Sequence, residues 1–134
     1  MYKYSDLVNK KVLITGASGD IGLAICEKFL EQKCTVYALY KSNVEPLIAL
    51  KGNHANGNLL NILPCDLTSQ KEVTALCERL TVEAGRLDVL VNNTGIVKDS
   101  LFASMTFDDF YSVISINLLS LFRLTKEALM LRSE

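Results

Sequence analysis

A glycine-rich turn near the start of the chain constrains the fold more than any other feature. It reads Thr15-Gly16-Ala17-Ser18-Gly19-Asp20-Ile21-Gly22, and it separates a short apolar strand pattern from a helical pattern. Glycines at such a turn adopt backbone angles that a Cβ forbids, and they let main-chain N–H groups approach an anion. The helix that follows points its unpaired N–H groups at the same place. The sequence therefore favours a dinucleotide phosphate site over an ordinary tight strand-to-helix connection.

Length and composition predict one domain and exclude several classes of function. The chain has 134 residues, 49% hydrophobic and 22% charged, with a net charge of -1 at pH 7. This balance argues against a nucleic-acid surface or a basic membrane patch. No stretch approaches 18 uninterrupted apolar residues, so we expect no membrane segment. Residues 1–6 contain no apolar run, so we expect no signal peptide and a cytoplasmic protein.

Cysteine and histidine positions do not predict a metal site. The four cysteines fall inside helix and strand patterns without C-x-x-C spacing: Cys26, Cys34, Cys65 and Cys77. We expect buried free thiols rather than a disulfide or a metal site. His54, the only histidine, lies in the polar stretch 51–58, which composition predicts to be a surface loop. We interpret His54 as a solvated loop residue rather than a catalytic base.

Strand and helix patterns alternate along the chain. We expect strands at 11–15, 34–40, 59–65 and 87–92, and helices at 21–33, 43–50, 69–84 and 106–131. Ser69 with Glu72 forms a capping-box pattern, and Thr106 and Asp20 stand where they can cap helices. Alternation with short connections predicts an α/β fold with a doubly wound, Rossmann-like parallel sheet between two helix layers.

The helix expected at 106–131 is apolar on more than one face. Its large apolar residues are Phe110, Val113, Ile114, Leu118, Leu121, Phe122 and Leu129. A helix that is hydrophobic nearly all round needs cover on more than one side. Either further chain or a second subunit could provide it. We favour a subunit contact, and so a homo-oligomer formed through this helix.

Polar motifs follow three of the expected strands, and one lies within the last helix. They are the glycine-rich turn, Cys65-Asp66-Leu67, Asn92-Asn93-Thr94-Gly95, and Asn117 in Ile116-Asn117-Leu118. The strand-end motifs meet at the carboxyl edge of the sheet, where an open α/β fold binds its ligand. Taken alone, Asp66 could be a helix-entry turn residue, Asn92 a strand-end hydrogen bonder, and Asn117 a packing accommodation. Their combination resembles the short-chain dehydrogenase/reductase family, from about residue 6 onward.

The resemblance implies a role for each motif residue. It implies that Gly16, Ser18, Gly19, Ile21 and Gly22 line the pyrophosphate and adenosine ribose of a bound dinucleotide. It implies that Asp66 accepts a hydrogen bond from the adenine amino group and that Leu67 donates a main-chain N–H. It places Asn93 and Gly95 along the adenosine ribose. Asn117 would kink its helix and hold a water in the proton relay, as the one catalytic residue in this chain.

The sequence departs from the family pattern in three ways. Asp20 replaces the middle glycine, and we expect its carboxylate to turn away from the pyrophosphate and cap the following helix. Thr94 replaces a family alanine, which is a small change. The family's catalytic Ser and Tyr-x-x-x-Lys pair would lie beyond residue 134. Tyr111 is not that Tyr, because Ser115 stands four residues on. We therefore expect one NAD(P)-binding Rossmann domain, residues 1–134, incomplete at its C-terminus.

The activity that the resemblance implies is NADPH-dependent reduction of a ketone by hydride transfer. Residues 96–101 and 122–126 are most similar to the 3-oxoacyl-[acyl-carrier-protein] reductases. The expected substrate is therefore a small-molecule or acyl-carrier-bound ketone, with a 3-oxoacyl thioester favoured. NADP is expected because Lys41, rather than an acidic residue, follows the second strand. A non-catalytic dinucleotide-binding or sensing module is the alternative, and a flavodoxin-like domain is disfavoured. The 134 residues alone should show no catalysis, because without the Tyr and Lys there is no positioned proton donor. They should also self-associate, because the strand at 87–92 becomes an exposed edge and the helix at 106–131 loses part of its apolar cover.

Overall fold

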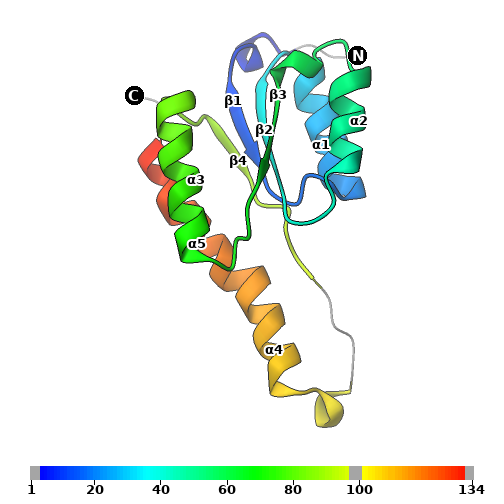
Figure 1. Cartoon of the computed structure of the whole chain (residues 1–134), viewed down its shortest axis with the longest axis vertical. Coiled ribbons are helices and arrows are strands. Elements are labelled where there is room, and N and C mark those ends of the chain that lie inside the picture. Colours follow the sequence, from blue (N-terminus) through cyan, green and yellow to red (C-terminus); the bar gives the residue numbers. More distant parts are fainter. Residues whose placement is uncertain (1–3, 97–100, 132–134) are drawn as a thin grey trace.

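The chain folds around a parallel sheet with helices on both faces (Figure 1). The computed structural model describes residues 4–96 and 101–131. The strands are β1 (Lys11–Ile14), β2 (Thr35–Tyr40), β3 (Leu60–Pro64) and β4 (Val89–Val91). They form one four-stranded sheet in the order β3-β2-β1-β4, with every pair parallel. The predicted Rossmann-like, doubly wound α/β fold is confirmed.

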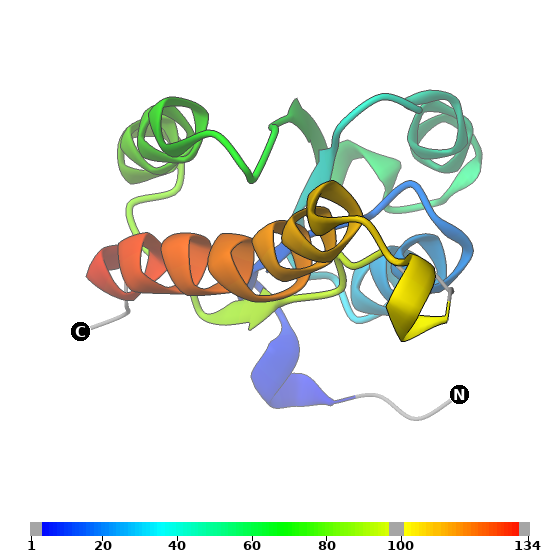
Figure 2. The ribbon, with the colours of Figure 1, turned by 90° about the horizontal axis from the view of Figure 1, so that it is seen from below.

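The helices form two layers that enclose the sheet (Figures 1 and 2). The α-helices are α1 (Asp20–Glu31), α2 (Glu45–Asn53), α3 (Gln70–Glu83), α4 (Phe107–Ile114) and α5 (Ser120–Ala128). Short 3-10 turns lie at Ser5–Leu7, Gly57–Leu59, Phe102–Ser104 and Leu129–Leu131. Helices α1 and α2 cover one face of the sheet, and α3 and α5 cover the other.

Alternation along β1 divides the core between the two faces. Val12 and Ile14 point to the α1 side, where they pack with Leu30, and Leu13 points to the other side with Leu124. Successive side chains of a strand face opposite ways, so a strand covered on both faces must be apolar throughout. Val12, Leu13 and Ile14 all have no exposed surface.

A buried carboxylate fixes the start of the β1–β4 pair. Asp88 Oδ2 accepts hydrogen bonds from the Lys11 main-chain N–H at 2.8 Å and from Arg86 Nε at 3.1 Å. Burial alone would raise the pKa of Asp88, but these donors outweigh it and hold the pKa below its usual range. Asp88 therefore stays ionised at neutral pH and holds the two strands in register.

Two of the predicted helix caps are confirmed and one is wrong. Ser69 Oγ accepts from the Glu72 N–H at 3.2 Å, and Thr106 Oγ1 accepts from the Asp109 N–H at 3.1 Å. Asp20 is not a cap: Gly19 is the N-cap of α1, and Asp20 is the first helical residue. The glycine turn enters the helix one residue earlier than predicted. The Asp20 carboxylate is thus exposed in the first turn, where it is favourable to the helix dipole.

The stretch 51–58 is more ordered than a surface loop. Helix α2 continues to Asn53, and His54 follows as its C-cap, with Nδ1 accepting from the Asn56 N–H at 2.9 Å. Lys51 Nζ donates to the carbonyls of Gly57 and Leu60, and Gly57 is buried. A Cβ at Gly57 would lie 1.9 Å from the Lys51 carbonyl oxygen, so only glycine fits there. All four cysteines are buried and free, as predicted.

The predicted helix at 106–131 is present, but it contains a π-helical turn around Asn117, where the resemblance implies a kink. This π-helical turn (Ser115–Leu119) separates α4 from α5, and Ser120 Oγ, at the start of α5, donates to the Ser115 carbonyl at 2.8 Å. We call residues 107–122 the helical arm, because α4 projects beyond the sheet (Figure 1). Within the described residues, no helix is long and apolar enough to span a membrane.

Candidate functional site

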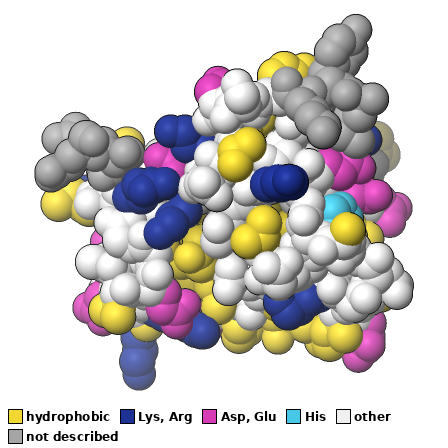
Figure 3. All heavy atoms as spheres, turned by 90° about the horizontal axis from the view of Figure 1, so that it is seen from above, with side chains coloured by type: hydrophobic (Ala, Val, Ile, Leu, Met, Phe, Trp, Pro, Cys, Tyr) yellow, Lys and Arg dark blue, Asp and Glu magenta, His cyan; other side chains and the backbone are white. Residues whose placement is uncertain are grey.

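A pocket of about 630 Å³ lies at the carboxyl ends of the strands. The elements that line it are the turn after β1, residues 39–43 at the end of β2, residues 65–68 after β3, residues 93–96 after β4, and part of the helical arm. Figure 3 shows the opposite end of the molecule, where basic and acidic side chains are interspersed. The crevice position is the one that open α/β sheets use for ligands.

The sequence-predicted residues come together in this pocket with two exceptions. Those that line it are Gly16, Ser18, Gly19, Ile21, Lys41, Asp66, Leu67, Asn93 and Gly95. Gly22 is buried beneath the turn instead, and a Cβ there would lie 2.1 Å from the Gly16 carbonyl oxygen. Asn117 does not line the pocket either. The residues of the helical arm that line the pocket are Ile116 and Ser120.

The glycine-rich turn has the geometry that an anion site requires. Gly16 has φ +58, a left-handed angle that favours glycine. Gly19 caps α1, so the first turn of a 12-residue helix directs its free N–H groups toward the pocket. Asp20, the first residue of α1, also lines the pocket.

Thr15 and Asn93 connect the turn to the end of β4. The buried Thr15 Oγ1 accepts from the main-chain N–H groups of Asn93 at 2.8 Å and Thr94 at 3.0 Å. In return, Asn93 Nδ2 donates to the Gly16 carbonyl at 3.2 Å. The role of Thr15 was not predicted. A threonine ending an otherwise apolar strand is the signal that could have indicated it.

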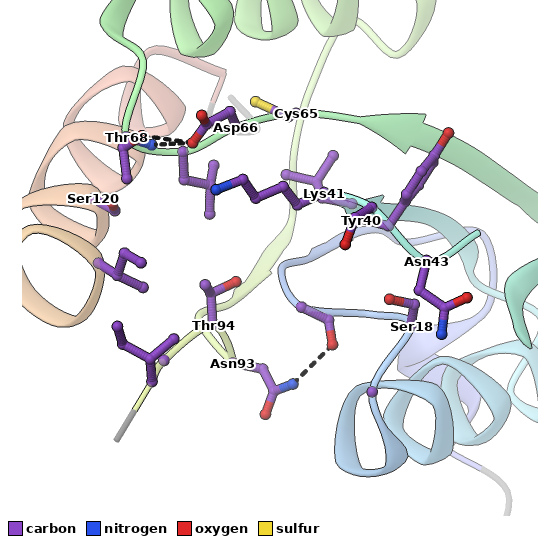
Figure 4. Close-up of a pocket in the computed structure, with 18 of the residues that line it drawn as sticks. Ser18, Tyr40, Lys41, Asn43, Cys65, Asp66, Thr68, Asn93, Thr94 and Ser120 are labelled. Atoms are coloured by element: carbon purple, nitrogen blue, oxygen red, sulfur yellow. Dashed lines mark hydrogen bonds between the residues drawn. The ribbon is translucent and has the colours of Figure 1, made fainter. Parts of the chain in front are cut away.

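The loop after β3 presents a fixed carboxylate. Asp66 Oδ1 accepts from the Thr68 N–H at 3.0 Å and from the Thr68 hydroxyl at 2.6 Å (Figure 4). These hydrogen bonds hold the pKa of Asp66 below its usual range, and the positive charge of Lys41 acts in the same direction. Cys65 beside it is inert, because burial and the neighbouring carboxylates raise the pKa of its thiol to about 12.

The end of β2 contributes several polar groups and no carboxylate. Lys41 extends across the pocket toward Asp66 and Thr68, while Asn43 lies close to Ser18 (Figure 4). Ser42 and Asn43 also line the pocket and were not predicted. They follow Lys41 directly, so their position after a strand was the available signal.

Asn117 holds the backbone beside Gly95. Its Oδ1 accepts from the Ile96 N–H at 2.8 Å, and its Nδ2 donates to the Ile96 carbonyl at 2.8 Å. The oxygen and the nitrogen of the Asn117 side-chain amide therefore both bond to the backbone of Ile96. Residues 96–101 carry part of the sequence similarity to the 3-oxoacyl-[acyl-carrier-protein] reductases. Positions 97–100 of that stretch lie outside the described residues.

A Tyr-x-x-x-Lys spacing does occur at Tyr37 and Lys41, but the structure rules it out as a catalytic pair. Both residues lie on or just after β2, where four residues span about 13 Å. Tyr37 is buried in the core with 4% exposure, and burial raises the pKa of its hydroxyl. No group of three or more His, Cys, Asp or Glu side chains that could hold a metal occurs among the described residues.

Comparisons with known proteins match nearly the whole chain. A family model described as short chain dehydrogenase matches residues 10–133. The chain is 42% identical over 124 residues to 3-oxoacyl-[acyl-carrier-protein] reductase FabG of Rickettsia bellii, covering 92% of this chain and 48% of that protein. It is 38% identical over 122 residues to Nodulation protein G of Rhizobium sp. (strain N33), covering 91% and 49%. The chain thus spans about half the length of these curated relatives.

Solved structures agree with the topology. A short-chain dehydrogenase/reductase of the glucose/ribitol dehydrogenase type from Brucella melitensis superposes with a TM-score of 0.89 at 28% identity, over 99% of this chain and 56% of that one. A variant of ElxO with NADPH bound superposes with a TM-score of 0.83 at 28% identity, over 92% and 50%.

Proposed function

The chain belongs to the short-chain dehydrogenase/reductase family, whose members use a nicotinamide dinucleotide, and from this premise we propose that its pocket binds NADP(H). The activity we propose is reduction of a ketone by an oxidoreductase that includes these residues. The bound cofactor would supply the hydride, and these residues would bind and orient it.

The polar end of β2 is the observation that carries the preference for NADP(H). An NAD site places an acidic residue there to hold the ribose 2′-hydroxyl. Here Lys41, Ser42 and Asn43 line the pocket together with Ser18, and none is acidic. A lysine ammonium with neighbouring hydroxyl and amide donors suits a 2′-phosphate. The NADPH bound to the structurally similar ElxO variant supports the same assignment.

The remaining pocket groups fit the other parts of the cofactor. The N–H groups at the start of α1 suit the pyrophosphate, with Gly22 allowing the helix to pack close to the turn. The Asp66 carboxylate and the Leu67 N–H suit the amino group and ring nitrogen of adenine. Asn93 and Gly95 suit the adenosine ribose. A catalytic role for Asn117 stays a prediction.

A 3-oxoacyl thioester is the substrate class we propose. The support is the 42% identity to a relative named as a 3-oxoacyl-[acyl-carrier-protein] reductase. We further propose a homo-oligomer formed through the helical arm, whose apolar side chains include Leu118 at 56% and Phe122 at 64% exposure.

Binding measurements on the 134-residue chain test the cofactor assignment. Titration should give a lower Kd for NADPH than for NADH. Lys41→Asp should weaken NADPH binding about tenfold and NADH binding much less, because the 2′-phosphate that the lysine charge would attract is present in NADPH and absent from NADH. Lys126→Asp, which changes an exposed lysine outside the pocket, is the matched control and should change neither. Tighter binding of NADH by the unmodified chain would contradict the assignment.

A further inference from the structure

Arg123 of α5 contacts the loop that follows β3. Its Nη1 donates to the Leu67 carbonyl at 3.0 Å, and its Nε donates to the Gln70 side-chain oxygen at 3.1 Å. We infer that Arg123 is a positioning residue that enables this loop to select adenine over other bases. This inference rests on the proposed NADP(H) site.

One planar peptide unit connects Arg123 to the carboxylate of Asp66. The carbonyl of the Leu67–Thr68 peptide accepts from Arg123, and the N–H of that same peptide donates to Asp66 Oδ1 at 3.0 Å. A peptide unit is rigid, so holding its carbonyl also fixes the direction of its N–H. Arg123 therefore sets the orientation of the Asp66 carboxylate without touching it.

The other polar groups of the loop leave a specific pair free for a ligand. The Asp66 N–H donates to Glu72 Oε1, and the Asp66 carbonyl accepts from the Ser69 N–H. Within residues 4–96 and 101–131, the Leu67 N–H has no acceptor and Asp66 Oδ2 has no donor. The loop thus offers one donor and one acceptor at the pocket wall.

The partners of Arg123 are those of a loop anchor rather than of an ion pair. Both are neutral oxygens, and no carboxylate of the described chain lies within ion-pair distance of its guanidinium. Gln70 is itself held, because its Nε2 donates to Thr74 Oγ1 at 3.1 Å and to Glu127 Oε1 at 3.5 Å. The two-pronged guanidinium therefore connects α5 to both the loop and the start of α3.

The free Leu67 N–H and the free Asp66 Oδ2 complement the hydrogen-bonding edge of adenine but not that of hypoxanthine. Adenine presents an amino donor beside a ring-nitrogen acceptor, which complements a carboxylate beside an N–H. Hypoxanthine presents a carbonyl oxygen and a protonated ring nitrogen instead, so both contacts are lost and two acceptors face each other. Discrimination between the two bases therefore depends on how firmly the loop is held.

The test compares binding of NADPH with binding of its analogue that carries hypoxanthine in place of adenine. The unmodified chain should bind NADPH about tenfold or more tightly than the analogue. Arg123→Met should reduce this ratio to about twofold. Arg123→Lys, which keeps one donor for the Leu67 carbonyl, should give an intermediate ratio. Arg79→Met removes an arginine from an exposed ion pair on α3 and should leave the ratio unchanged.

The outcomes separate the positioning role from the cofactor assignment. If the unmodified chain binds neither dinucleotide, the proposed function fails. If the unmodified chain binds NADPH and Arg123→Met keeps its full preference for NADPH over the hypoxanthine analogue, the positioning role is wrong. This holds even if Arg123→Met weakens the binding of both dinucleotides equally. A chain that shows no preference for adenine also overturns it. Should Arg123→Met fail to fold, Arg123→Lys and Gln70→Leu give the same readout, and an unchanged ratio in both overturns the proposal.

Discussion

The sheet and the helical arm solve the problem of burying apolar surface in different ways. On β1, Val12, Leu13 and Ile14 have no exposed surface, because α1 covers one side and α5 the other. On the arm, Phe107 is 74% exposed and Phe122 is 64% exposed. Both regions are rich in large apolar residues, so composition does not distinguish them.

The difference shows which parts of the chain bury their own large apolar side chains. Helices α1, α2, α3 and α5 cover the central strands of the sheet, and the strand ends position the glycine-rich turn, the loop after β3 and Asn93. Asn117 of the arm holds only the segment at Ile96. The arm contributes only Ile116 and Ser120 to the pocket and leaves an apolar surface exposed. Cofactor binding should thus depend on the sheet, and association on the arm.

The largest expected effect comes from adding one methyl group beneath the glycine-rich turn. In Gly22→Ala, the new Cβ would lie 2.1 Å from the Gly16 carbonyl oxygen and 2.8 Å from Ala17 Cα. Backbone must move, so we expect a loss of about 3 kcal/mol or more in the free energy of unfolding. NADPH binding should fall with it. Chemical denaturation and cofactor titration measure the two quantities.

Gly52→Ala is the matched control. Gly52 lies in α2, and a Cβ there meets no atom within 4 Å. Alanine is a better helix former than glycine, so this variant should gain about 0.5–1 kcal/mol of stability. Equal effects of the two substitutions would show that the close packing of turn and helix is not what holds the site.

Substitutions on the helical arm should have a smaller effect on stability but should clearly change the mass of the self-associated chain. The double variant Leu118→Lys and Phe122→Lys should lower the mass of the self-associated chain in light scattering, because it places charges on the exposed apolar surface. Stability should change by less than about 1 kcal/mol at these exposed positions. Val82→Lys on α3, at 87% exposure, is the control and should leave the mass unchanged. A double variant with the mass of the unmodified chain would contradict an interface on the arm.

Much of the fold could be predicted from the sequence because the evidence for it is local. Apolar runs and helical spacing predict the strands and helices, and Ser69 and Thr106 mark two helix starts correctly. The meeting of the turn, Asp66 and Asn93 at one edge follows from the parallel order of the strands.

The remaining features depend on tertiary structure that periodicity does not encode. The entry of the chain into α1 made Gly19 rather than Asp20 the cap. The π-helical turn lies within a pattern that helical spacing predicts as one helix, and the hydroxyl of Ser120, at the start of α5, donates across it to the Ser115 carbonyl. Arg123 reaches a loop more than fifty residues earlier in the chain, a contact that exists only once α5 packs on α3.

Hydrogen–deuterium exchange with and without NADPH tests the central claim most directly, because it reports where the cofactor binds. Slower exchange is expected in the turn at 16–22, the loop at 66–68 and the segment at 93–95, with no change in α4. Protection confined to α4, or binding that leaves all three segments unchanged, would contradict a cofactor site at the carboxyl edge of the sheet.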